Sequence, residues 1–246
     1  MPGQRSAERD ARREQAKREE RAERILDAAA TLILRWGYNK TTLDDIARQA
    51  RVARGTIYLH WKTREELLMA LITRERLKVG EEIRQRMESD PAGMTLRGLL
   101  KISMLAVMKN PLMRAVLSRN TEMLGKLADQ EYAQSSFTES IAAYKQFLEM
   151  LRAQGLVGTD LDIYKQTHIL GAIWFGFFTA NTWLPEEFQF SDEAIAELLA
   201  ETAQRVLAPQ PTRSNAADSS AAQTILSQYV DREIQNMRKM YEEHQP

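Results

Sequence analysis

Three observations predict that this chain is an all-α protein. Helix-forming residues dominate a sequence of 246 residues that contains only 11 Gly and 7 Pro. Apolar residues recur at the three- and four-residue steps of a helix in one segment after another. The strongest helix breakers, residues 90–93 and 110–111, fall between these segments. With a hydrophobic content of 43%, we expect a helical protein with a real core.

Residues 1–20 form a charged N-terminal extension in which acidic residues interrupt the basic ones as far as Glu23. We expect either a disordered segment or, better supported, an exposed helix that continues into the next element. An arm whose Arg residues contact DNA phosphates or the minor groove is the alternative.

The first regular helix is expected from about Arg21 to Trp36. Its inward positions have helical spacing and are Ile25, Ala28, Ala29, Leu32, Ile33 and Trp36. Gly37 is suited to the position just after a helix. We expect Trp36 and Trp61 to be core residues. Tyr38 follows at the turn, where its hydroxyl either reaches a phosphate or packs at the surface.

Residues 41–62 are expected to form a helix, a tight turn and a second short helix. Thr42 is a good N-cap, and acidic residues follow it in the first turn, where the helix dipole favours them. One apolar stripe contains Leu43, Ile46, Ala47 and Ala50. The turn falls at Val52 and Ala53, and the second helix begins at Arg54.

The second helix has the composition of a recognition helix for the DNA major groove. Ile57 points to the core and leaves a short, largely uncharged outer face on which Gly55 permits close approach. The neighbouring polar side chains can reach bases or phosphates. The predicted DNA-binding residues are Thr42, Arg54, Gly55, Thr56, Tyr58, Leu59, His60 and Lys62.

Residues 24–72 resemble the N-terminal domain of the TetR family of bacterial transcriptional regulators. The segments that carry the resemblance are Gly37-Tyr38, Thr41-Thr42, Asp45-Ile46-Ala47, Gly55-Thr56-Ile57-Tyr58 and Trp61 to Leu67. Three positions depart from the usual pattern: Trp61 replaces Phe, Thr63-Arg64 replaces Ser-Lys, and Ala53 replaces a Ser that often touches phosphate. The rest of the chain is similar only in length and helical character. The resemblance implies a homodimer that binds operator DNA.

A fourth helix is expected from Thr63, with Thr63 and Glu66 as a capping box, to the breaker at Asp90. In the family, as the resemblance implies, movement of this helix changes the spacing of the two recognition helices. Amphipathic helices follow after Met94 and after Pro111, and from about Gln130 to Gln154. Two more are expected from Asp160 to Trp183 and after an N-cap at Ser191.

The segment from His168 to Trp183 is apolar nearly all round, and such a helix must be buried on every side. We interpret this segment and the helix that ends near Val206 as the half of a four-helix dimer interface that one chain contributes. The predicted interface residues are Ile173, Phe177, Ala180, Ile195 and Leu199. The alternative is a core within one chain.

Residues 209–222 are rich in Pro, Ser and Ala and are predicted to be a linker. Residues 223–244 then form an amphipathic helix beyond the minimum family plan. A single helix is not stable alone, so it packs on its own body, on the partner subunit or in a short coiled coil.

A ligand site is predicted among Met and aromatic residues of the body, because adaptable Met side chains suit a pocket for apolar ligands. The candidates are Met104, Met108, Met123, Tyr144, Phe147, Trp174 and Phe178. For any single Met, ordinary core packing is the more common role.

Charge is distributed unevenly between the two parts of the chain. Residues 1–64 carry 15 Lys and Arg against 9 Asp and Glu, a net charge of +6, and the remaining 19 against 25 give −6. A basic N-terminal module on an acidic body is typical of a DNA-binding protein with a regulatory domain.

Enzyme chemistry is not indicated by the sequence. It contains no Cys, its three His lack metal-ligand spacing, and no glycine-rich nucleotide loop is present. We therefore expect no catalytic residues, no metal and no cofactor. The sequence has neither a long apolar run nor a secretory signal, so we expect a cytoplasmic protein.

The sequence thus predicts a charged extension (1–20), a three-helix DNA-binding domain with a helix-turn-helix (21–66), a larger helical regulatory and dimerisation domain (67–208), and the linker and C-terminal helix. We interpret the chain as a homodimeric repressor that a small, largely apolar ligand releases from a palindromic operator. The alternative is a DNA-binding structural or partner-recruiting protein of the same fold without an inducer, and an activator is not distinguished from a repressor.

Overall fold

The structure, a computed structural model, describes residues 2–118, 120, 131–208 and 219–243. Throughout these ranges the regular elements are helices, which confirms the predicted all-α class. No helix of the described ranges is both long and apolar enough to span a membrane.

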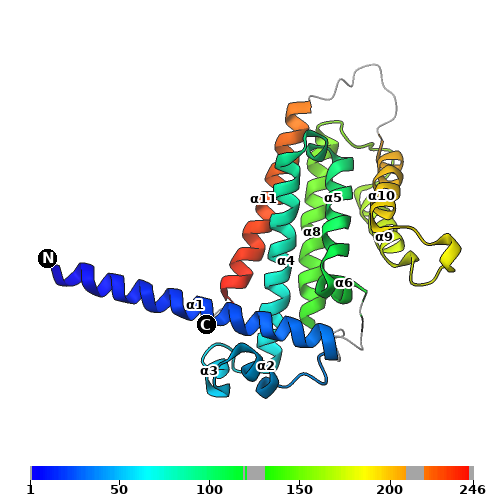
Figure 1. Ribbon diagram of the computed structural model, residues 1–246. Coiled ribbons are helices and arrows are strands. Elements are labelled where there is room, and N and C mark those ends of the chain that lie inside the picture. Colours follow the sequence, from blue (N-terminus) through cyan, green and yellow to red (C-terminus); the bar gives the residue numbers. More distant parts are fainter. Residues whose placement is uncertain (1, 119, 121–130, 209–218, 244–246) are drawn as a thin grey trace.

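The N-terminal head consists of α1 (Pro2–Trp36), α2 (Leu43–Ala50), α3 (Arg54–Tyr58) and the first turns of α4 (Arg64–Ser89). Their apolar faces meet in one core, in which Ile25, Ile57 and Leu68 are completely buried. The prediction that Ile57 points inward is confirmed. Figure 1 shows α1 lying across the head, with its N-terminal half projecting beyond it as a free-standing helix.

Local signals in the sequence account for the ends of the head helices. The Thr42 hydroxyl accepts a hydrogen bond from the Asp45 backbone N–H, and the Asp45 carboxylate accepts one from Thr42 N–H, so the N-cap of α2 is satisfied in both directions. Gly37 follows α1 with a φ of 78°, as its predicted role at the helix end requires. Arg51 ends α2 in the left-handed region with a φ of 55°.

The body is a layered helical bundle. Its elements are α4, a 3-10 turn η1 (Pro91–Met94), α5 (Leu96–Lys109), α6 (Pro111–Leu117), α8 (Glu131–Ala153), α9 (Ile163–Ala180), a second 3-10 turn η3 (Glu186–Phe188) and α10 (Asp192–Leu207). In Figure 1, α4, α5 and α8 form the central layer, and α9 and α10 cover it on one side. Ser191 caps α10 as predicted.

The α5 helix is fixed on both sides. Its Gly98 lies so close to η1 that a Cβ atom there would be 2.1 Å from the Ala92 carbonyl oxygen, so only glycine fits. On its other side, α10 packs against α5, and Lys101 pairs with Glu197 at 2.5 Å across the contact. This central layer connects the head to the outer helices.

The C-terminal helix α11 (Ser219–Glu243) packs on its own body, against α4 and α8. Leu226, Val230 and Ile234 are buried there. Of the three arrangements that the sequence left open, the structure has the first.

The charged extension is helical and continuous with α1 back to Pro2, which is the better supported of the two arrangements predicted for it. Trp36, predicted to be a core residue, is 42% exposed and lies beneath the Arg35 guanidinium, with 5.7 Å between the guanidinium carbon and the ring centroid. The helix ends at this residue, so no later turn covers its ring. Trp61 is buried as predicted.

Candidate nucleic-acid interface

The recognition helix α3 lies on the outer surface of the head (Figure 1). Arg54, Gly55 and Tyr58 are exposed, Thr56 is half-buried, and Leu59, just after the helix, is 68% exposed. A Cβ atom built on Gly55 would meet nothing within 4 Å, so the backbone is open to a flat partner. The structure therefore brings most of the predicted DNA-binding residues onto one surface.

The side chain of Arg54 is held in place by two neighbours. Its guanidinium donates to the Asp44 carboxylate of α2 at 2.9 Å and to the Tyr58 hydroxyl at 3.2 Å. The hydrogen bond to Tyr58 and the charge of Asp44 raise the pKa of Arg54 above its usual value. Arg54 thus stays charged and is directed along the helix surface before any ligand binds.

Asp44 is a candidate site residue that the sequence prediction did not include. Its position in the first turn of α2 is already explained by the helix dipole, so there was no reason in the sequence to expect that it also pairs with Arg54. Only the packing of α2 against α3 brings its carboxylate to Arg54, ten residues later in the chain.

His60 departs from the prediction that it contacts DNA. Its side chain is only 7% exposed and lies beside the Trp61 ring, with 5.4 Å between the ring centroids. Burial, together with the positive charges of Arg18 and Arg21, lowers the pKa of His60. His60 is therefore a neutral packing residue between the end of α3 and α1.

The remaining predicted DNA contacts flank the recognition helix. Lys62 is exposed, and its backbone N–H donates to the Glu66 carboxylate at 2.7 Å. The Thr63 hydroxyl caps α4 by accepting from Glu66 N–H. Thr42 is exposed, but its hydroxyl donates to Asp45 at 2.6 Å, so the cap of α2 already uses it.

Tyr38 has the packing role rather than the phosphate role. It is buried, its hydroxyl donates to Glu65 at 3.0 Å, and Arg64 lies over its ring. Burial, opposed by the charge of Arg64, raises its pKa to about 12. These contacts fix the start of α4 to the end of α1.

The predicted ligand residues of the body come together in one apolar cluster. Met104, Met108, Phe147 and Phe178 are buried in it, and Tyr144 and Trp174 pack against it. The rings of Trp174 and Phe178 stack with their centroids 5.4 Å apart. Met123 lies outside the described residues. The four buried side chains of the cluster are each at most 4% exposed.

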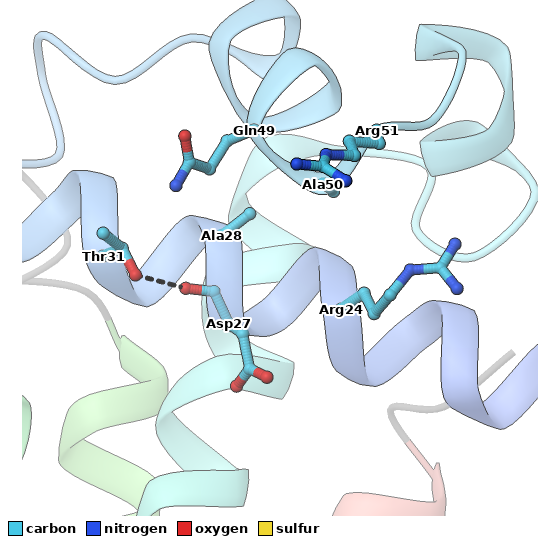
Figure 2. A pocket seen from close by; sticks show the side chains of 7 residues that line it. All are labelled: Arg24, Asp27, Ala28, Thr31, Gln49, Ala50 and Arg51. Atoms are coloured by element: carbon cyan, nitrogen blue, oxygen red, sulfur yellow. Dashed lines mark hydrogen bonds between the residues drawn. The ribbon is translucent and has the colours of Figure 1, made fainter.

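Two hollows lie elsewhere on the described part of the molecule. One, of about 560 Å³, is a wide-mouthed depression between α1 and α2 (Figure 2), lined by Arg24, Asp27, Ala28, Thr31, Gln49, Ala50 and Arg51. Another lies on the polar surface of α4. Neither is lined by the predicted ligand residues.

The predicted dimer surface has to be corrected on α10. Ile195 and Leu199 are fully buried against their own chain, so they are core residues. On the same helix, Leu198 and Val206 are each 39% exposed. On α9, Ile173 and Phe177 are half-buried against the body and Ala180 is half-buried.

The outer face of α9 is open and made of small residues. Ala172 is exposed, and Cβ atoms built on Gly171 and Gly176 would meet nothing within 4 Å. The segment that follows exposes large apolar side chains, with Trp183 at 84% and Phe188 at 57%. Two hydrogen bonds between Asn181 and the Phe190 backbone hold this segment in shape.

Comparisons with known proteins agree with this architecture. Residues 25–71 match the family described as bacterial regulatory proteins, tetR family. The HTH-type transcriptional regulator AcrR of Shigella flexneri is 25% identical over 190 residues, which are 75% of this chain and 88% of that protein. The fatty acid metabolism regulator protein of Bacillus subtilis is 44% identical over 66 residues, or 27% of this chain and 32% of that protein.

A solved structure shows the likeness of the fold. The structure of NalD, the secondary repressor of the MexAB-OprM multidrug efflux pump in Pseudomonas aeruginosa, superposes with a TM-score of 0.54 at 25% identity. The match covers 78% of this chain and 98% of that one.

Proposed function

Because the chain belongs to the TetR family of bacterial transcriptional regulators, we propose that it is a homodimeric, sequence-specific DNA-binding repressor rather than an enzyme. The observation that carries the proposal is the exposed face of α3 in the matched domain, with Arg54 positioned by Asp44 and Tyr58. The relatives named as repressors support the sign of regulation. Because bacterial DNA lies in the cytoplasm, we propose that the protein acts there.

At the DNA, the proposed roles follow from chemistry and exposure. Gly55 lets the backbone of α3 approach the major groove closely, Thr56 and Tyr58 reach bases or phosphates, and Leu59 offers an apolar contact to a thymine methyl group. Arg54 and Lys62 neutralise phosphates. Because Asp44 partly neutralises Arg54, the Arg54–Asp44 pair has to rearrange or share its proton donors when a phosphate approaches.

The proposed dimer forms through the outer faces of α9 and α10 and the segment between them. Exposed apolar groups such as Trp183, Phe188 and Leu198 support this, since a contiguous apolar patch of this kind marks an interaction site. The small residues of α9 permit close helix–helix approach. A two-fold dimer places two α3 helices on successive half-sites of a near-palindromic operator.

The proposed effector is a small, largely apolar molecule that binds among the clustered Met and aromatic residues of α5, α8 and α9. Since Met104, Phe147 and Phe178 are buried, the proposed ligand binds a conformer in which these side chains move apart. It changes DNA binding only through a difference in affinity between the two conformers; a ~10- to 100-fold difference corresponds to roughly 1.4–2.7 kcal/mol.

The burial of this cluster also favours a second candidate. In that case the protein is a DNA-binding structural or partner-recruiting protein of the same fold, without a small-molecule inducer, and the body is simply a core. The two candidates differ in whether an apolar ligand changes the affinity for the operator.

The decisive experiment selects bound duplexes from a random DNA pool at fixed salt concentration and then footprints the enriched sequence. We expect an inverted repeat protected on two half-sites. Salt-sensitive binding without an enriched sequence would contradict the proposal, because phosphate contacts alone carry no sequence information. Matched titrations of the selected duplex with and without a panel of apolar compounds then separate the two candidates.

A further inference from the structure

The C-terminal helix α11 reaches from the interior of the body to the DNA-binding head. Figure 1 shows it lying along α4, with its first turns beside the far end of the body and its C-terminus next to α1. Its 25 residues correspond to a rod of roughly 37 Å at 1.5 Å per residue. Specific contacts in its first half and near its C-terminal end join two regions that have separate proposed roles.

In its first half, α11 contacts the predicted ligand cluster. The Tyr229 ring stacks on the Phe147 ring with 4.3 Å between their centroids and 19° between their planes. Phe147 is completely buried, so the stack is a core contact. A ligand that displaces Phe147 therefore has to move or repack Tyr229.

Along its middle, α11 is seated tightly on α4. A Cβ atom on Gly80 of α4 would lie 3.2 Å from the Cγ1 atom of Ile234 and 3.4 Å from the Cε atom of Met237. Arg238 pairs with Glu81 at 2.9 Å on the outer side of the same contact. The close seat leaves little room for α11 to tilt independently of α4.

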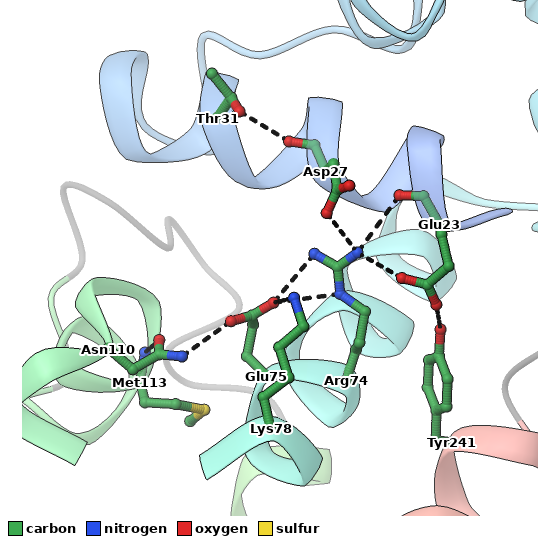
Figure 3. Close-up of polar contacts among 9 residues, drawn as sticks. All are labelled: Glu23, Asp27, Thr31, Arg74, Glu75, Lys78, Asn110, Met113 and Tyr241. Atoms are coloured by element: carbon green, nitrogen blue, oxygen red, sulfur yellow. Dashed lines mark hydrogen bonds and ion pairs between the residues drawn. The ribbon is translucent and has the colours of Figure 1, made fainter. Parts of the chain in front are cut away.

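At the head end, Tyr241 of α11 packs against the head core, and its hydroxyl donates to a carboxylate oxygen of Glu23 in α1. The other oxygen of Glu23 accepts from Arg74 of α4 at 3.0 Å. Arg74 also pairs with Asp27 of α1 at 2.8 Å. Figure 3 shows Arg74 and Tyr241 approaching Glu23 from different helices.

The same cluster extends to the start of α6. Glu75 pairs with Arg74 at 3.0 Å and accepts a hydrogen bond from the side-chain NH2 group of Asn110 at 2.9 Å. The side-chain oxygen of Asn110 in turn caps α6 by accepting from Met113 N–H. The Arg74 side chain is 4% exposed; burial alone would lower its pKa, but the surrounding carboxylates outweigh this and raise it. A charged group buried in this way tolerates little rearrangement without losing a partner.

We propose that α11 is a second element, besides α4, that couples the body to the head. A movement in the body would reach α11 through the Tyr229–Phe147 stack and would reach the head through the Tyr241–Glu23 hydrogen bond. The proposal rests on the proposed function, since it concerns how that function is regulated. Coupling requires an element whose arrangement both sites influence, and α11 is in physical contact with both. Motion at Phe147 then changes the angle between α1 and α4 at the Glu23–Arg74 cluster.

The test uses the full chain, the selected operator duplex and hydrogen exchange. In the natural chain, operator binding should protect head peptides and should also change the exchange rate of residues 230–243 at least three-fold, although these residues lie on the body side of α1. Tyr241→Phe removes only the hydroxyl. In this variant the head should still be protected, the response of residues 230–243 should be lost, and the operator Kd should change at least three-fold.

Thr224→Val serves as the matched control, because it also removes one hydroxyl from α11, at an exposed position where the hydroxyl donates to the Ser220 carbonyl of the same helix at 2.9 Å. Its operator Kd and exchange response should equal those of the natural chain. Protection of the head without any response in residues 230–243 of the natural chain would overturn the proposal, as would a Tyr241→Phe variant with unchanged response and Kd. If no duplex protects the head, the proposed function itself fails, and this outcome is recognisable from the head peptides alone.

Discussion

The head and the outer layer of the body differ in whether their apolar side chains are buried within one chain. In the head, the apolar stripes of α1, α2 and α4 close on one another, and Ile25, Ile57 and Leu68 have no exposed surface. In the outer layer, α9 presents an open face, and Trp183, Phe188 and Phe190 are each more than half exposed. The head is complete within one chain, whereas the outer layer needs a partner to become buried.

The difference follows from the work proposed for each region. A DNA reader has to present polar side chains on a fixed backbone, so its core has to be closed before DNA binds. A dimer surface gains its stability from apolar area that stays exposed until two chains meet. The variants below test this contrast, starting with the largest expected effect.

Arg74→Met should destabilise the junction between the head and the body most strongly. Removing one partner of a buried ion pair costs about 3–5 kcal/mol, because the remaining charge stays buried; here Glu75 is only 12% exposed. Urea unfolding at pH 7 measures the loss. Arg84→Met is the control, since Arg84 faces Glu88 at 3.9 Å on the surface, and it should change the free energy of unfolding by less than about 0.5 kcal/mol. Equal effects of the two variants would show that the junction is not a stabilising element.

Ala172→Glu should dissociate the proposed dimer without unfolding the chain. The exposed Ala172 lies on the open face of α9, and dimer formation would take one carboxylate per subunit out of water there, beside Gly176 and the exposed His168. We expect at least a ~100-fold rise in the dimer dissociation constant, equivalent to about 2.7 kcal/mol, measured by analytical ultracentrifugation. Gln154→Glu introduces a carboxylate at an exposed position of the loop after α8 and should leave the dimer intact. A dimeric Ala172→Glu variant would place the interface elsewhere.

Tyr58→Ala should weaken operator binding while the closed head core stays folded. It removes a proposed DNA contact and the hydroxyl that accepts a hydrogen bond from Arg54. We expect about a ten-fold higher Kd for the operator, near the lower end of the range for a base or phosphate contact, and an unchanged melting temperature. Gln154→Ala, at an exposed position of the turn after α8, truncates a side chain outside the proposed DNA and dimer surfaces and should bind normally. Unchanged operator affinity of Tyr58→Ala would remove Tyr58 from the interface.

Glu75→Gln should change how stability depends on pH. Burial alone would raise the pKa of Glu75, but hydrogen bonds from Lys78 and Asn110 outweigh burial and lower it below the usual 4.5. A carboxyl with a lowered pKa in the folded state stabilises the protein above its unfolded pKa, and this contribution is lost as the pH falls through the folded value. The variant should therefore be less stable by about 1 kcal/mol at pH 7, and the difference should shrink below pH 4.5 in urea unfolding series. A difference that does not vary with pH would contradict the assignment.

Arg51→Gly should have the smallest effect and should stabilise the head. Among the residues that the structure describes, Arg51 is the one non-glycine residue with a positive φ. The left-handed region costs a residue with a Cβ atom about 1 kcal/mol. The greater freedom of glycine in the unfolded chain offsets part of this gain, so we expect roughly 0.5 kcal/mol by urea unfolding. Arg48→Gly, in the last turn of α2, is the control and should destabilise the head instead. A loss of stability in Arg51→Gly would show that its side chain contributes more than its backbone strain removes.

The sequence predicted the head in greater detail than the body. The caps at Thr42 and Thr63, the inward position of Ile57 and the helix end at Gly37 depend on groups a few residues apart, so local physical chemistry determines them. Only His60 and Trp36 were placed wrongly there. His60 is buried and Trp36 is exposed because of which neighbouring elements cover them, and helical spacing does not report that.

In the body, the sequence determined which segments are helical and how they end, because periodicity and breakers are local properties. The tertiary structure decided which face of each helix turns inward. The pattern of α10 is compatible with either face, and packing against α5 chose Ile195 and Leu199 for the core and left Leu198 outside. Likewise, the cluster of Glu23, Arg74 and Tyr241 joins three helices from distant parts of the chain, and no spacing along the sequence encodes such a meeting.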